Sequence, residues 1–149
     1  MTNNTVLRGV RYLLNVSDEK LKEIIALGGA VVKHSDVITY LLKEEEAGYV
    51  ECPDTVMAHF LDGLIIFKRG RDESRPLPPI EIPITNNIVL KKLRVAFQLK
   101  DVDIIALIEK AGLSLTKTEL SAFFRQPDHR NYRVCHDQFL RNVLKGLTP

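Results

Sequence analysis

The sequence predicts an all-α protein that consists of two tandem four-helix repeats related by internal pseudo-symmetry. Three observations support this prediction. Residues 2–66 align without a gap on residues 85–149, with 15 identities in 65 positions, and a repeat at fixed spacing defines the structural unit. The apolar residues of both copies recur with the 3.6-residue period of half-buried helices. Neither copy contains an alternating segment long enough for a strand.

The first helix of each copy is the clearest amphipathic segment. In the first copy we expect it from about Thr5 to Asn15, and in the second copy at the equivalent positions 83 residues later. Asn4 and Asn87 stand immediately before these segments, and asparagine is a favoured N-cap residue. We therefore expect both asparagines to cap their helices.

The second helices have clear signals at both ends. Asp18 and Asp101 stand where these helices begin, and acidic residues are favoured in a first turn. Gly29 and Gly112 follow the last apolar turn, where a left-handed residue commonly ends a helix. We expect both glycines to adopt that conformation.

The third and fourth helices complete each repeat. In the second copy, Thr116 and Glu119 have the spacing of a capping box at the start of the third helix. A loop with the motif Tyr-x-x-Cys-x-Asp follows in both copies, and its aspartates, Asp54 and Asp137, precede an apolar helical stripe. We interpret these two aspartates as caps of the fourth helix rather than as general bases.

The segment between the copies is rich in proline. Residues 70–84 contain four prolines, which exclude a helix and favour extended polyproline geometry. We therefore expect one helical repeat over residues 1–69, a linker over 70–84 and a second repeat over 85–149. A repeat of this size is marginal as an isolated domain, so we expect the repeats to pack together, within one chain or by exchange between two.

Several of these segments resemble a known family. They are the doubled Asn-Asn-x-x-Leu motif, the Tyr-x-x-Cys-x-Asp loops and residues 63–70, 119–125 and 131–142. They resemble the YehS-like family of uncharacterised bacterial proteins, and the resemblance covers essentially the whole chain. It implies a cytoplasmic bacterial protein with the same unit in tandem. It brings no established activity, cofactor or catalytic residue.

Composition agrees with a globular cytoplasmic protein. Of the 149 residues, 45% are hydrophobic and 27% are charged, which is typical of a domain with an ordinary core. No stretch approaches the roughly 20 apolar residues of a membrane helix, and the amino terminus lacks the pattern of a signal peptide. The two cysteines suit a reducing compartment.

Some polar residues and thiols recur in both copies, and we interpret them as structural. A thiol near a helix N-terminus can be reactive, whereas a free cysteine more often packs as a small apolar residue. A repeated arginine can form an anion site twice, or an Arg–Asp pair that holds each unit together. The residues concerned are Arg11, Arg94, Asp54, Asp137, Cys52 and Cys135.

The sequence favours a protein without catalytic activity. It contains no glycine-rich phosphate loop, no serine nucleophile elbow and no pair of carboxylates with a supporting histidine. It also lacks the cysteine and histidine spacings of a zinc site. We therefore predict neither a cofactor nor a metal.

Charge differs between the copies. The net charge is +2, yet residues 1–69 hold 8 lysines and arginines against 10 acidic residues, and residues 85–149 hold 11 against 6. The second copy contains a cationic segment with a tyrosine, which suits contact with a phosphate backbone and base stacking. The simpler interpretation of this segment is a solvated basic face. The candidate contact residues are Arg125, His129, Arg130, Tyr132, Arg133, Arg141 and Lys145.

The equivalent loop of the first copy is acidic. Residues 44–46 are three glutamates, and Glu51 stands nearby. We therefore predict a non-catalytic module that contacts RNA or DNA through the second repeat. The alternative is a protein–protein adaptor or a self-associating protein in which the acidic and basic loops pair.

Overall fold

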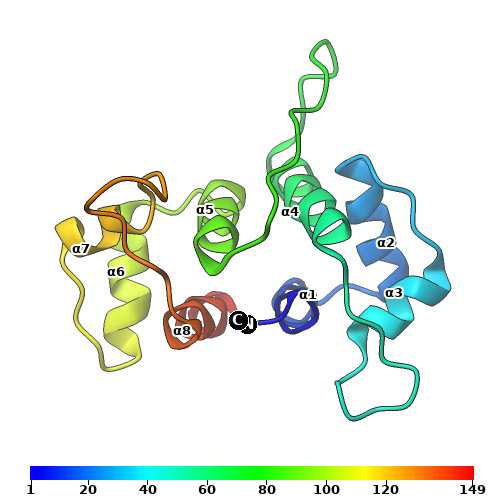
Figure 1. Cartoon of the computed structure of the whole chain (residues 1–149), viewed down its shortest axis with the longest axis horizontal. Helices are drawn as coiled ribbons and strands as arrows, with labels where there is room; N and C mark the ends of the chain where they lie inside the picture. Colours follow the sequence, from blue (N-terminus) through cyan, green and yellow to red (C-terminus); the bar gives the residue numbers. More distant parts are fainter. The chain divides into compact units, whose positions relative to one another are not determined.

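The computed structural model describes residues 1–149, which form eight helices and no strand (Figure 1). The chain divides into two compact units, Met1–Ile84 and Thr85–Pro149. The all-α prediction is therefore confirmed. The first unit contains α1 (Asn3–Leu14), α2 (Asp18–Leu27), α3 (His34–Leu41) and α4 (Asp54–Arg69). The second contains α5 (Asn86–Ala96), α6 (Asp101–Lys110), α7 (Lys117–Ala122) and α8 (Asp137–Leu147).

The first unit is built on close packing between α2 and α4, which lie side by side in Figure 1. Glycines permit this contact: a Cβ on Gly28 would lie 1.7 Å from the carbonyl oxygen of His59, and a Cβ on Gly63 would lie 1.9 Å from that of Ile24. Helix α1 packs on α3 and α4. The core side chains include Leu7, Leu21, Ile24, Ile25, Met57, Phe60, Leu61 and Leu64.

The second unit repeats this arrangement with looser helix packing. Helix α8 packs against α6 and α5, and α6 also contacts α7. Gly146 is the equivalent of Gly63, but a Cβ there would meet the Leu107 side chain at 2.8 Å rather than backbone. Phe123 and Phe139, with ring centroids 4.7 Å apart, tie the end of α7 to α8.

Helices α1 and α5 begin earlier than we predicted, and their caps are different. Thr2 and Thr85 are the N-caps: their hydroxyls accept from the backbone N–H groups of Thr5 (3.1 Å) and Ile88 (3.2 Å). The predicted capping role of Asn4 and Asn87 is therefore wrong. Because a threonine already satisfies the helix end, each asparagine side chain is available for another contact.

Each first helix begins with a pair of asparagines, Asn3–Asn4 in α1 and Asn86–Asn87 in α5. These asparagines join the first helix of each unit to the loop before its fourth helix. In the first unit, Asn4 Nδ2 donates to the carbonyl oxygens of Tyr40 (3.1 Å) and Val50 (2.8 Å), and Asn4 Oδ1 accepts from Cys52 N (2.9 Å). Asn3 Nδ2 donates to Asp54 Oδ1 at 2.8 Å. These contacts satisfy buried polar groups of an irregular segment, which would otherwise cost free energy.

The remaining helix ends test two further predictions. Gly29 and Gly112 have φ of 107° and 83°, so the expected left-handed conformation is confirmed. The capping box is also confirmed, because Thr116 and Glu119 exchange side-chain to backbone hydrogen bonds of 3.1 Å each.

The prediction that Asp54 and Asp137 are caps is wrong. Each is the first residue of its helix, and the preceding Pro53 and His136 occupy the cap positions without a side-chain hydrogen bond. The carboxylates instead accept from the asparagines at the start of α1 and α5. They therefore join two helices rather than end one.

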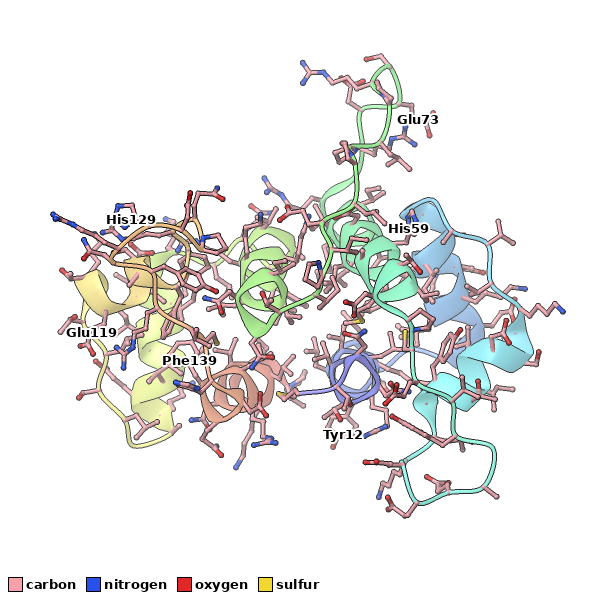
Figure 2. All side chains as sticks on the ribbon, viewed as in Figure 1. Tyr12, His59, Glu73, Glu119, His129 and Phe139 are labelled. Carbon is pink, nitrogen blue, oxygen red and sulfur yellow. The ribbon has the colours of Figure 1, made fainter.

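The proline-rich segment belongs to the first compact unit. Its outermost part projects beyond α4, with Glu73 near the tip in Figure 2. The Leu77 side chain packs next to Gly29, and the Ile84 N–H donates to Asp54 Oδ2 at 3.1 Å. None of the eight helices combines the length and the apolar composition that crossing a bilayer requires.

Candidate functional site

The repeated arginines form the same ion pair in both units. Arg11 Nη2 lies 3.1 Å from Asp18 Oδ1, and Arg94 Nη2 lies 2.8 Å from Asp101 Oδ1. The Arg94 guanidinium also stacks over the Phe124 ring at 4.6 Å. Each pair joins the end of the first helix to the start of the second, which is a structural use of the arginine.

The repeated cysteines are buried and carry no disulfide. Burial, with a smaller contribution from the charge of Asp54 or Asp137, raises the pKa of both Cys52 and Cys135 to about 12. A thiol is nucleophilic as its thiolate, so these side chains are protonated and unreactive at neutral pH. No group of three or more histidine, cysteine or acidic side chains is arranged to hold a metal ion.

The loop before the fourth helix makes two equivalent hydrogen-bonded turns in both units and carries opposite charge. We define the acidic loop as residues 42–51 and the basic loop as residues 125–134. In the acidic loop, Glu46 N donates to Lys43 O (2.9 Å) and Tyr49 N donates to Glu46 O (3.3 Å). In the basic loop, His129 N donates to Gln126 O and Tyr132 N donates to His129 O, each at 2.9 Å.

Asn87 anchors the basic loop as Asn4 anchors the acidic one. Its Nδ2 donates to Phe123 O (3.0 Å) and Arg133 O (2.8 Å), and its Oδ1 accepts from Cys135 N (2.9 Å). The side chain of Asn87 is buried. The two loops are therefore held on equivalent supports, and they differ in the side chains that they present.

Arg125 and His129 form the most unusual contact of the basic loop. Asn131 N donates to His129 Nδ1 at 3.0 Å, and Arg125 Nη1 lies 3.5 Å from His129 Nε2. A neutral imidazole has one acceptor nitrogen, so it cannot accept both bonds. The shorter bond uses Nδ1, which places the ring proton on Nε2, facing the guanidinium. Arg125 Nε is also buried without a hydrogen-bond partner.

This arrangement brings N–H donors from two side chains together at an exposed loop (Figure 2, His129). Donors that face each other are satisfied when an anionic oxygen accepts from both, and charge-assisted bonds of this kind are stronger than neutral ones. The Arg125 guanidinium and the His129 imidazole therefore lie within 3.5 Å of each other on this loop.

The other candidate residues divide into two groups. Arg130, Arg141 and Lys145 are exposed, and the charge of Arg141 helps to lower the pKa of Asp137. Arg133, in contrast, pairs with Glu119 (3.3 Å) and lies 5.7 Å from the Phe123 ring centroid. Tyr132 is half-buried. Three exposed cations therefore accompany the Arg125–His129 pair.

Comparison with known proteins identifies the repeat. The family described as "Protein of unknown function (DUF1456)" matches residues 3–70 and 86–149. The chain belongs to the DUF1456 family. It is 47% identical over 147 residues to "Uncharacterized protein YehS" of Escherichia coli (strain K12), covering 99% of this chain and 94% of that protein. The resemblance to the YehS-like family is confirmed. No solved structure matches the chain.

The two DUF1456 segments correspond to α1–α4 and α5–α8. Sequence reasoning identified the basic residues but not the Arg125–His129 contact, nor the role of Glu119 as the partner of Arg133. Hydrogen bonds within an irregular loop leave no periodic signal. The asparagines at positions 3, 4, 86 and 87 could have been recognised from sequence, because they occur at the same place in both DUF1456 repeats.

Proposed function

We propose that this DUF1456 protein is a non-catalytic binding module whose basic loop and helix α8 contact an anionic partner, RNA or DNA. The observation that carries the proposal is the Arg125–His129 pair, which places a guanidinium nitrogen 3.5 Å from an imidazole nitrogen on the basic loop, where both groups can donate to a phosphate. Buried, protonated cysteines suit a protein of the reducing cytoplasm.

The surrounding cations support the same proposal. Arg141 and Lys145 are four residues apart on α8 and share one face of that helix, while Arg130 is exposed on the loop itself. Each cation that neutralises a phosphate releases counterions, which gives affinity without sequence preference. Because Arg133 is held by Glu119, we assign it a positioning role.

The experiment measures binding of labelled single-stranded RNA and DNA by fluorescence anisotropy. Oligonucleotides of about 12 nucleotides suit a site of this size, and titrations are run at about 50 mM and about 200 mM salt. We expect binding by the unmodified protein, weakening with salt. The variant Arg125→Glu, Arg130→Glu is expected to bind on the order of tenfold more weakly or worse.

A matched control changes the same charge elsewhere. Lys33→Glu, Arg71→Glu alters two exposed cations of the first unit, and its affinity should stay within about threefold of the unmodified protein. Equal loss in both variants would attribute binding to net charge and contradict the proposal. Absence of any binding to either nucleic acid would also contradict it, in favour of the adaptor alternative.

A further inference from the structure

The acidic loop carries charges that its own folding does not require. Glu46 has a local role, since its Oε1 accepts from Lys43 N at 2.9 Å. Glu44, Glu45 and Glu51 are exposed and form no ion pair. The basic loop makes the same backbone turns with proline, aspartate and valine at the three equivalent positions. The three carboxylates are therefore available for contact with a partner.

A partner for these carboxylates needs N–H donors on an accessible, complementary surface. Every copy of this chain carries one, because the basic loop presents the facing donors of Arg125 and His129 together with exposed Arg130. Carboxylates and phosphates are recognised by the same charge-assisted bonds. A glutamate of the acidic loop can therefore take the position that a phosphate oxygen would take.

We propose that the acidic loop of one copy docks on the basic loop of a second copy. Each copy supplies one acidic and one basic loop, so a pair of copies offers two such contacts. Complementary charge sets the pairing and speeds encounter. Docking uses the same donors as the proposed nucleic-acid site, so dimer formation and nucleic-acid binding compete. The docking itself does not require that nucleic acid binds.

Sedimentation velocity of the full chain over a concentration series tests the docking. At about 50 mM salt we expect a monomer–dimer equilibrium, and at about 500 mM salt we expect a shift to monomer, because exposed charges are screened beyond a Debye length of only a few ångströms. A chain that stays monomeric at low salt and high concentration would overturn the proposal. A dimer that is unaffected by salt would also overturn it.

Two charge-reversal variants locate the contact. Glu44→Lys, Glu45→Lys removes the acidic loop's charge, and Arg125→Glu, Arg130→Glu removes that of the basic loop. Each variant alone should lose the dimer, with dissociation constants raised on the order of tenfold or more. The matched control Glu73→Lys, Glu109→Lys changes two exposed glutamates outside both loops and should retain it. Circular dichroism confirms that each variant is folded.

Mixing the two variants gives the decisive measurement. The first variant keeps an intact basic loop and the second keeps an intact acidic loop, so an equimolar mixture should form a heterodimer through one contact. A mixture of folded variants that remains monomeric would overturn the proposal. Titration of RNA into Glu44→Lys, Glu45→Lys separates the two proposals: failure to bind RNA there contradicts the nucleic-acid function and leaves the sedimentation result unaffected.

Discussion

At the scale of single residues, the features that recur in both repeats serve the fold. Asn4 and Asn87 each make three hydrogen bonds that hold an irregular loop. Arg11 and Arg94 each pair with an aspartate across a helix junction. The residues that carry charge on the exposed loops, in contrast, differ between the repeats. Residues that recur in both repeats therefore have structural roles in this chain, and the charged loop residues that differ are the candidates for function.

The thiols provide a test at this scale. Burial raises the pKa of Cys52 and Cys135 to about 12, so we expect iodoacetamide near pH 8 to label neither thiol in the native protein and both in concentrated guanidinium chloride. Mass spectrometry of the labelled protein measures this difference. Native labelling at the rate of the denatured control would contradict the assignment of both cysteines as structural.

Because the pKa of both thiols is raised in the folded protein, the free energy of unfolding depends on pH. An unfolded thiol ionises near its ordinary value of 9.0, whereas the folded thiols stay protonated up to about 12. Above pH 9 the unfolded state therefore loses protons that the folded state keeps, and the free energy of unfolding falls as pH rises through this range. Below pH 9 the thiols are protonated in both states, so their contribution to the free energy of unfolding is fully present there.

At the scale of elements, the two repeats differ in how closely their second and fourth helices approach. Gly28 and Gly63 bring the backbones of α2 and α4 into contact. In the second repeat, Ala111 replaces the first of these glycines, and Gly146 faces a side chain. The sequence pattern predicted the helices in both repeats. It did not predict the closeness of this contact, because periodicity reports which face is buried and not the distance between helix axes.

Matched substitutions test this difference. Gly63→Ala would place a methyl group against the Ile24 carbonyl at 1.9 Å, and we expect it to lower the free energy of unfolding by about 3 kcal/mol or more. Gly146→Ala meets the Leu107 side chain rather than backbone, most closely its terminal Cδ2, and gains helix propensity, so its net effect should be within about 1 kcal/mol. Urea unfolding curves measure both. Equal effects of the two substitutions would contradict the difference in packing.

At the scale of the whole molecule, the chain presents two equivalent scaffolds with opposite electrostatic character. The all-α class and the tandem repeat could be predicted from sequence, because a gapless alignment and helical periodicity are signals spread over many residues. The Arg125–His129 contact could not, since it depends on the turn that bonds His129 to Asn131. The capping errors at Asn4 and Asp54 have a related cause: the side chains that seemed suited to local caps make tertiary bonds instead.

The most direct measurement of this account is an exchange of the two loops. Placing the sequence of residues 125–134 at positions 42–51, and the reverse, preserves composition and net charge while moving the basic loop to the first repeat. We predict that this protein still binds single-stranded RNA, but more weakly than the unmodified chain, because the exchange separates the basic loop from Arg141 and Lys145 of α8. A second protein with the acidic sequence in both repeats should fold and not bind. Loss of binding in a folded exchange protein, or binding by the protein with two acidic loops, would contradict the account.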